Sequence, residues 1–325
     1  MADKLIDQYP DRAAELMAAN GQRAPMSLRI NTCVTSTQDY KNQLEAADIG
    51  YTEGPWPESL ILDHPQPASD LPGWSRGECA VQDLAAQSAG QIMMQLLRGN
   101  TYEQGALRIL DACAAPGGKL FHLKETLTAA GLKHQLYALD NKAKRLDDIA
   151  LIGERLGHRT HFQQPTLIST ERQEMIAEDS VVLGCADAGK SPIPFAESFD
   201  AILIDAPCSG SGTIRRNPDI RLLLTPDTLQ QLPLQQHRLL QNLWQHVKPG
   251  GNLVYATCSV FAEENDQVIH SFLVKNRDAQ VVPLRLDLDL GSPTQYGLQL
   301  LPTNALTDGF YYCALSKMPH LASTS

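Results

Sequence analysis

Two cysteines, Cys208 and Cys258, have similar surroundings and residue types suited to a reaction. Cys208 lies in DAPCSGSGTIRR, residues 205–216, and Cys258 lies in YATCSV, residues 255–260. Each cysteine precedes a serine and follows the end of an apolar run, whereas a cysteine that only packs is more often found among Val and Ile within such a run. A thiolate is a nucleophile that can bond covalently to a substrate. The two positions therefore favour chemistry over packing.

A glycine-containing turn and an acidic residue predict a site for a nucleoside cofactor. In DACAAPGGK, residues 111–119, Gly117 and Gly118 would let the backbone turn tightly and approach a ligand, and the amides of the following helix favour an anionic or carboxylate group. Asp140 ends the next apolar run, a position from which a carboxylate accepts ribose hydroxyls. The alternative is a capped helix and a surface aspartate. The segment also departs from the G-x-G-x-x-G pattern of dinucleotide sites.

The apolar runs from about residue 78 onward predict a doubly wound α/β domain. They alternate with helical patterns, which is typical of a parallel sheet covered on both faces. Ligands bind beyond the carboxyl ends of such strands, so we expect the polar residues at these ends to share one edge of the sheet. Residues 160–180 have no clear period, and we interpret them as an insertion. The runs are 106–112, 135–140, 180–187, 199–207 and 251–259, with Asp111, Asp140, Asp187, Asp205 and Cys258 at or just beyond their ends.

The first 77 residues predict a small α+β domain followed by a linker. A helical region interrupted at Pro10 precedes a strand, a helix capped by Ser36 or Thr37, and a second strand. A segment with three prolines and two glycines then predicts the connection to the larger domain, residues 78–325. The ranges are 3–20, 26–32, 36–50 and 59–63 for the elements and 64–77 for the linker.

Length, composition and charge narrow the class of protein. The 325 residues suit about two domains, and 43% hydrophobic with 20% charged residues is ordinary for a globular protein. No apolar run approaches the roughly 20 residues of a membrane span and the amino end lacks a signal-peptide pattern, so we expect a cytoplasmic protein that does not bind membranes. Seven scattered cysteines without a C-x-x-C pair argue against disulfides and against a metal site. The net charge of −10 argues against tight, sequence-blind binding of nucleic acid.

The motifs resemble, in order and approximate spacing, those of the S-adenosylmethionine-dependent RNA cytosine-5 methyltransferases, above all the members that act on bacterial 16S rRNA. The two-cysteine combination is more specific than the glycine turn. This resemblance implies a Rossmann-like methyltransferase domain with an RRM-like small domain. The matching segments are DACAAPGGK, LD at 139–140, AD at 186–187, DAPCSGSG, YATCSV, PMSLRINT at 25–32, CAVQDLAAQ at 79–87, RRNPDIR at 215–221 and DGFYYCAL at 308–315.

The resemblance also implies the roles of the site residues. Cys258 would add to C6 of cytosine, because C5 is a poor nucleophile until a thiolate has been added, and Cys208 would assist release of the product. Asp205 would bind the polar edge of the base and lie near the cofactor. Asp140 would bind the ribose of S-adenosylmethionine and Asp187 would face its adenine, although a cap at a strand end is the alternative for Asp187. The methionine part would contact Cys113, Ala114, Ala115, Pro116, Gly117, Gly118 and Lys119, the last of which is otherwise a solvated lysine.

The expected partner is RNA, namely 16S rRNA in unstacked or single-stranded form, because a stacked base cannot reach a cysteine. Arg215 and Arg216 would contact phosphates beside the target base, and the alternative is a solvated charged face. Family members commonly carry a further amino-terminal domain that resembles the antitermination factor NusB. The sequence begins immediately before the small domain, so we expect that module to be absent or truncated.

Two other classes of protein remain as alternatives. A nicotinamide-dependent oxidoreductase could use the same sheet, but it predicts G-x-G-x-x-G and gives no reason for two cysteines at the binding edge. A non-catalytic RNA-binding or ribosome-assembly factor could retain the fold, but it would need neither thiol.

Overall fold

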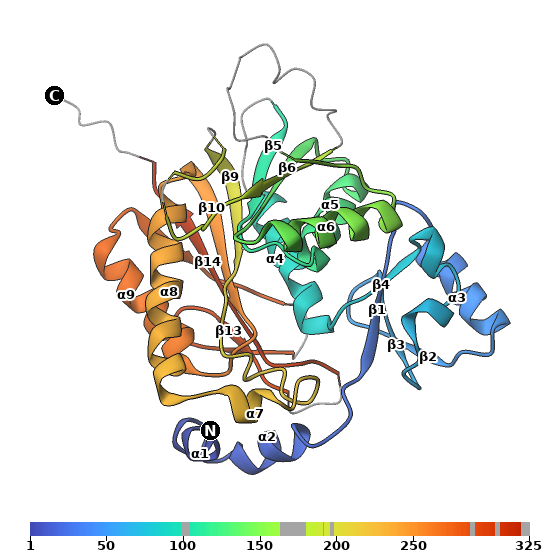
Figure 1. Ribbon diagram of the computed structural model, residues 1–325, viewed down its shortest axis with the longest axis horizontal. Helices are drawn as coiled ribbons and strands as arrows, with labels where there is room; N and C mark the ends of the chain where they lie inside the picture. Colours follow the sequence, from blue (N-terminus) through green and yellow to red (C-terminus); the bar gives the residue numbers. More distant parts are fainter. Residues whose placement is uncertain are drawn as a thin grey trace.

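The computed structural model describes residues 1–98, 105–162, 180–190, 192–195, 198–286, 290–302 and 306–319, which form a four-stranded and a ten-stranded sheet (Figure 1). Most of the insertion predicted at 160–180 lies outside the described residues. Its first residues, 160–162, form a strand at the edge of the larger sheet.

The larger sheet has the parallel core that the apolar runs predict. Its order is β12-β13-β14-β10-β9-β5-β6-β8-β7, and β11 pairs with β14. The strands from β10 to β7 run parallel, whereas β11 to β14 add antiparallel pairs that the sequence did not predict. The parallel strands are β5 (Leu107–Asp111), β6 (His134–Asp140), β7 (Thr160–Phe162), β8 (Val181–Cys185), β9 (Phe199–Asp205) and β10 (Val247–Thr257). The others are β11 (Ala279–Val282), β12 (Ser292–Pro293), β13 (Leu298–Leu300) and β14 (Phe310–Lys317).

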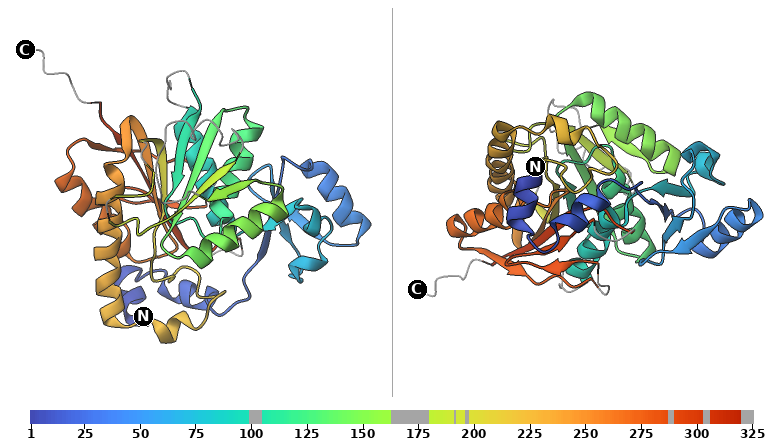
Figure 2. Two further views of the ribbon diagram at one scale, coloured as in Figure 1. Left: turned by 45° about the horizontal axis from the view of Figure 1, so that its top comes forward. Right: turned by 90° about the horizontal axis from the view of Figure 1, so that it is seen from below.

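Helices cover both faces of this sheet, which explains why its central strands β5, β6, β8 and β9 are largely apolar. Successive residues of one strand enter different cores: Ile109 packs with the helices of one face and Leu110 with those of the other. Each fully buried leucine or isoleucine contributes about 1.5–3 kcal/mol relative to an exposed one. Figure 2 shows the two layers from further directions. One face carries α4 (Leu84–Arg98), α5 (Gly118–Ala129) and α6 (Ala143–Leu156), and the other carries α8 (Pro226–Trp244) and α9 (Asp266–Lys275).

The smaller sheet has the order β2-β3-β1-β4, and Tyr40 and Leu44 of its helix α3 are buried in its core. The Ser36 side chain caps α3 by accepting the amide of Asp39 at 3.0 Å. Strand β4 pairs with β1, so hydrogen bonding extends this sheet past residue 77, and the division into 1–77 and 78–325 stays a prediction. The elements are β1 (Met26–Ile30), α3 (Thr37–Ala46), β2 (Tyr51–Glu53), β3 (Ser59–Leu62), β4 (Cys79–Val81) and the short 3₁₀ helices η1 (Ala68–Asp70) and η2 (Trp74–Arg76).

The first two helices, α1 (Ala2–Gln8) and α2 (Ala13–Ala19), separate at Pro10 as expected. They pack beneath the larger domain rather than on the small sheet (Figure 1). Leu5 and Leu16 form one apolar cluster with Val260 and Phe261, which follow Cys258 in the chain. The remaining short helices are α7 (Ile220–Leu223) and η4 (Ala262–Glu264). In the part of the chain that the structure describes, no helix is long and apolar enough to cross a bilayer.

Candidate active site

The predicted site residues meet where the parallel strands end. Asp111, Asp140 and Asp205 are the last residues of β5, β6 and β9. Strand β10 runs parallel to β9 with Ala256 opposite Asp205, so Cys258 leaves the sheet two residues beyond this pair. Parallel register therefore brings segments that are far apart in sequence to one edge.

The two cysteines are in direct contact. Cys208 Sγ lies 3.3 Å from Cys258 Sγ, and both side chains are half-buried. The amide of Gly212 donates to the carbonyl of Cys258 at 2.9 Å, which holds the loop after Cys208 against the end of β10. The hydrogen bond with Cys258 and burial raise the pKa of the Cys208 thiol well above its ordinary value. The Cys208 thiol therefore holds its proton more firmly than an ordinary cysteine does.

Lys119 and Asp205 form an ion pair beside the cysteines, with Nζ 2.6 Å from Oδ2. Lys119 also lies over the Phe310 ring, 4.9 Å from its centroid. Burial alone lowers the pKa of Lys119, but the charge of Asp205 and its hydrogen bond outweigh that effect and raise it. Lys119 is thus a mostly buried cation, with its side chain 11% exposed, bound to Asp205 and not a solvated residue of the first helical turn.

The turn between β5 and α5 has the backbone that its glycines predict. Gly117 has φ +105°, and a Cβ there would lie 2.8 Å from the Phe121 ring. Asp111 at the start of the segment is 2% exposed, and burial followed by the charge of Asp205 raises its pKa to about 7. Burial and Asp111 likewise raise the pKa of the Cys113 thiol, so Cys113 is neutral and unsuited to nucleophilic attack.

Asp140 is joined to this turn by Arg145, which sequence reasoning missed. Arg145 Nη1 lies 3.2 Å from Asp140 Oδ2, and its Nη2 donates to the carbonyl of Ala115 at 2.8 Å. The amide of Lys142 donates to Asp140 Oδ1 at 3.2 Å. A buried carboxylate at a strand end, next to a glycine turn, fits a nucleoside with a charged tail. The only signal in the sequence was a basic residue in the helix after Asp140.

The turn between β5 and α5 is also held by the small sheet. Arg29 of β1 is buried, pairs with Glu125 of α5 through Nε at 2.9 Å, and donates from Nη1 to the carbonyl of Gly118 at 2.7 Å. Arg29 therefore anchors the start of α5.

Asp187 lies at the same edge but stands apart from these contacts. It follows β8, whose Cys185 is paired with Asp140. Its side chain is exposed, accepts the amide of Gly189 at 2.9 Å and pairs with Lys190 at 3.0 Å, which lowers the pKa of Asp187. Its role at an adenine ring stays a prediction.

Arg215 and Arg216 are structural partners of Asp308. The Arg215 side chain is only 1% exposed and its Nε lies 2.7 Å from Asp308 Oδ1. Arg216 pairs with the other oxygen of Asp308 and, through Nη2, with Asp83 at 2.8 Å, and it keeps 29% exposure. The burial of Arg215 argues against the predicted phosphate contact, because its guanidinium is enclosed with a carboxylate; Arg216 alone stays a candidate.

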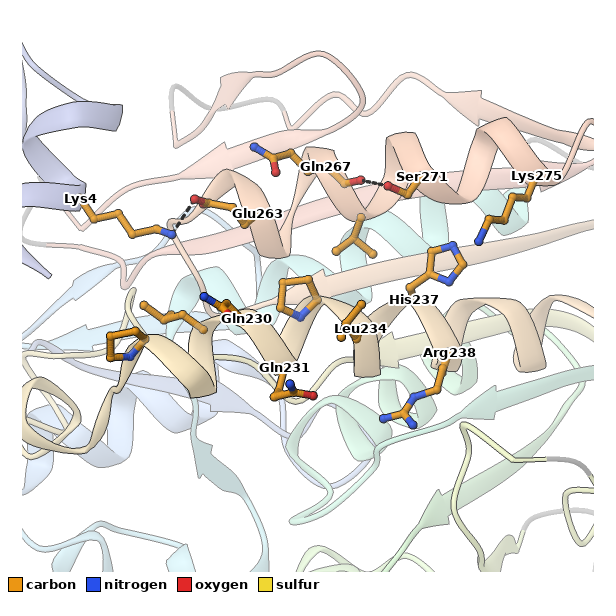
Figure 3. A pocket seen from close by; sticks show the side chains of 14 residues that line it. Lys4, Gln230, Gln231, Leu234, His237, Arg238, Glu263, Gln267, Ser271 and Lys275 are labelled. Atoms are coloured by element: carbon orange, nitrogen blue, oxygen red, sulfur yellow. Dashed lines mark hydrogen bonds and ion pairs between the residues drawn. The ribbon is translucent and has the colours of Figure 1, made fainter.

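A groove of about 950 Å³ between α8 and α9 lies elsewhere in the molecule (Figure 3). None of the predicted site residues lines it, and Figure 3 shows Lys4 directed at Glu263 across one end. Among the described residues, no group of three or more His, Cys, Asp or Glu side chains could hold a metal ion.

Residues 99–316 match the family model described as 16S rRNA methyltransferase RsmB/F. Residues 1–69 match a second model, described as the RsmF/B-like ferredoxin-like domain. A protein named ribosomal RNA small subunit methyltransferase B from Klebsiella pneumoniae strain 342 is 35% identical over 317 residues, 97% of this chain and 64% of that protein. A protein of the same name from Vibrio cholerae is 36% identical over 316 residues, 96% of this chain and 63% of that protein. The chain therefore spans a little less than two thirds of these relatives.

Solved structures share the fold. A methyltransferase homolog protein from Pyrococcus horikoshii has a TM-score of 0.75 at 26% identity, covering 97% of this chain and 94% of that one. NSun6 from the same organism, crystallised with SFG, has a TM-score of 0.77 at 18% identity and covers 97% of both chains. The predicted combination of a doubly wound sheet with a small α+β domain is confirmed.

Proposed function

The chain belongs to the 16S rRNA methyltransferase RsmB/F family, and from this membership we propose that it methylates C5 of a cytosine in RNA, namely 16S rRNA, with S-adenosylmethionine as the methyl donor. The observation that carries the proposal is the contact of 3.3 Å between Cys208 and Cys258 at the ligand-binding edge of the sheet.

Cys258 is the nucleophile in this proposal. Its thiolate adds to C6 of cytosine, forming an S–C6 bond and moving the C5–C6 electron pair onto C5. S-adenosylmethionine, when bound, supplies the methyl group that C5 then takes. Removal of the C5 proton restores the C5–C6 double bond and expels the Cys258 thiolate, so the enzyme returns to its starting state.

Cys208 is suited to the second half of the reaction. The hydrogen bond with Cys258 is the largest cause of the raised pKa of the Cys208 thiol. Once Cys258 is bonded to C6 it no longer exerts this effect, so Cys208 can release its proton to solvent water. The resulting Cys208 thiolate then accepts the proton on C5. The contact between the two thiols supports this order of events.

Asp205 and Lys119 orient the base. The Asp205 carboxylate, about one third exposed, is available to the polar edge of cytosine, while Lys119 fixes its position at 2.6 Å. A hydrogen bond that favours the protonated ring makes C6 more electrophilic.

The cofactor site in this proposal comprises the turn, Asp140 and Asp187. Asp140, with Arg145 holding its orientation, would accept the ribose hydroxyls. Asp187 would face the adenine. The methionine part would lie along the backbone of Cys113, Ala114, Ala115, Pro116, Gly117, Gly118 and Lys119, near the buried Asp111 carboxyl.

The RNA must present the target cytosine unstacked, since the thiols are half-buried at the sheet edge. Arg216 is the exposed cation nearest in sequence to the Cys208 loop and is proposed to contact phosphate. A non-catalytic RNA-binding or ribosome-assembly factor would need no pair of thiols in contact.

Bisulfite sequencing of total RNA from cells with and without the gene tests the function and finds the site. We expect one 5-methylcytosine of 16S rRNA to disappear with the gene and to return with the wild-type gene but not with a Cys258→Ala gene. Identical 5-methylcytosine profiles with and without the gene would refute the proposal.

A further inference from the structure

A cluster of buried serines joins the loop after Cys208 to the loop after Cys258. Ser209 and Ser259, the residues that follow the cysteines, have hydroxyl oxygens 3.2 Å apart. The hydroxyl of Ser211 lies 3.0 Å from that of Ser209 and 3.1 Å from that of Ser259, and it accepts the amide of Val260 at 3.0 Å. All three serines are buried. The two cysteine loops are thus hydrogen-bonded to each other behind the thiols.

The carboxylate of Glu264 holds this cluster together. Glu264 comes from η4 and is 1% exposed. Its Oε1 accepts the amide of Ser209 at 2.8 Å and the side-chain amide of Gln236 at 3.2 Å, and its Oε2 accepts the Ser259 hydroxyl. Within the described ranges no lysine or arginine pairs with this carboxylate. A buried carboxylate is costly unless hydrogen bonds stabilise it, and here the donors come from both cysteine loops and from Gln236. The position of Glu264 is therefore tied to both loops.

We propose that Glu264 is a positioning residue of the two-cysteine site: with Ser209, Ser211 and Ser259 it sets Cys208 against Cys258 and presents a fixed negative charge to Cys208. This inference rests on the proposed function, because it gives the charge a role in methyl transfer. Removing the charge should loosen the alignment of the thiols and make Cys208 easier to deprotonate.

Glu264 is one of several titratable groups that face Cys208. The titratable groups that face Cys208 are Cys258 at the end of β10, Glu264 of η4 and Tyr255 within β10. The hydroxyl of Tyr255 donates to the main-chain carbonyl of Glu264 at 2.6 Å. Cys258 and burial raise the pKa of Cys208 most, and the charge of Glu264 raises it further. After Cys258 has bonded to substrate, Glu264 is the charged group that remains to strengthen Cys208 as a base.

The first test measures the charge effect without RNA. In a Cys258→Ala background, the initial rate of Cys208 alkylation by iodoacetamide is followed from pH 6 to 11 by mass spectrometry. Glu264→Gln keeps the shape of the side chain and removes its charge, so the pH at which Cys208 alkylation reaches half its maximal rate should fall. The matched control is Glu263→Gln, since the Glu263 side chain is 41% exposed and pairs with Lys4. Equal behaviour of Cys208 in all three proteins would overturn the proposal.

The second test measures methyl transfer to RNA with both cysteines present. We expect Glu264→Gln to lower kcat by about tenfold to a hundredfold with KM for S-adenosylmethionine unchanged, because misplacement of reacting groups affects the chemical step. Glu263→Gln should leave both constants unchanged. An unchanged kcat in Glu264→Gln, or an equal loss in Glu263→Gln, would overturn the positioning role.

The two arms separate the possible failures. If the wild-type protein transfers no methyl group to RNA while the alkylation midpoint shifts as expected, the proposed function fails and the effect of Glu264 on Cys208 stands. If Glu264→Gln does not fold, Ser259→Ala removes a single donor to the carboxylate and carries the kinetic test, with the same expected loss of kcat.

Discussion

The Sγ atom of Cys208 lies 3.3 Å from the Sγ atom of Cys258, although fifty residues separate them in the chain. The contact follows from the parallel pairing of β9 and β10, which lets both loops leave the sheet at one edge. In the proposed reaction the same contact, which raises the pKa of the Cys208 thiol, suits the two cysteines to different roles.

Cys208→Ala should trap the reaction after methyl transfer. Without a base for the C5 proton, Cys258 remains bonded to C6, and a covalent protein–RNA complex accumulates. The complex is measured as a slower band on a denaturing gel with labelled RNA. The double variant Cys208→Ala/Cys258→Ala is the control and should give no such band; absence of the band from Cys208→Ala itself would refute the release role.

Asp140→Asn should weaken binding of S-adenosylmethionine. Loss of a charged acceptor for ribose hydroxyls costs about 1.5–3 kcal/mol, which is roughly a tenfold to hundredfold rise in Kd. Calorimetry with the cofactor or its demethylated product measures this change. Asp148→Asn, on the exposed side of α6, is the matched control, and equal affinities of the two variants would contradict the assignment.

Arg215→Ala should destabilise the fold and leave the salt dependence of RNA binding unchanged. The substitution takes one of two arginines from the buried Asp308, for a loss of about 2–4 kcal/mol in the free energy of unfolding. Urea denaturation measures this loss. Arg12→Ala, at an exposed pair with Glu15, should cost less than about 1 kcal/mol. A flatter salt dependence of RNA binding in Arg215→Ala, with an unaltered free energy of unfolding, would contradict this account and favour a phosphate contact of Arg215.

Asp111 should make the fold less stable as the pH rises from about 4 to 7. Its pKa is about 7 in the folded protein against 3.8 as the reference, so the folded state binds more protons in this window and stability falls with pH. The loss approaches about 4 kcal/mol above pH 7. Melting experiments at pH 5 and 8 should therefore show Asp111→Asn gaining stability over the wild type at the higher pH. A difference that does not change with pH would contradict the raised pKa.

The sequence was sufficient for the parallel core and its active edge. Long apolar runs that end on Asp111, Asp140 and Asp205 can only be buried on both faces, and their ends then meet. The antiparallel strands were missed for two reasons. Strands β12 and β13 are short, and the apolar residues of β14, such as Tyr311, predict burial but not whether the strand runs parallel or antiparallel to its neighbours.

The sequence did not predict which residues the charged side chains pair with. Arg215 and Asp308 are 93 positions apart, and nothing local distinguishes a buried arginine from one that faces phosphate. Glu264 and Glu263 look alike in the sequence, yet one is buried behind the thiols and the other is exposed. Such differences depend on tertiary packing, which spacing along the chain does not describe.

The central claim is that Cys258 is the nucleophile of methyl transfer to cytosine in RNA. The most direct measurement is transfer of a tritiated methyl group from S-adenosylmethionine to unmodified 16S rRNA by the wild-type protein and by Cys258→Ala, with cofactor affinity measured in parallel. We predict that the wild type labels C5 of one cytosine and that Cys258→Ala falls to background with its cofactor affinity unchanged. Full transfer by Cys258→Ala would contradict the account.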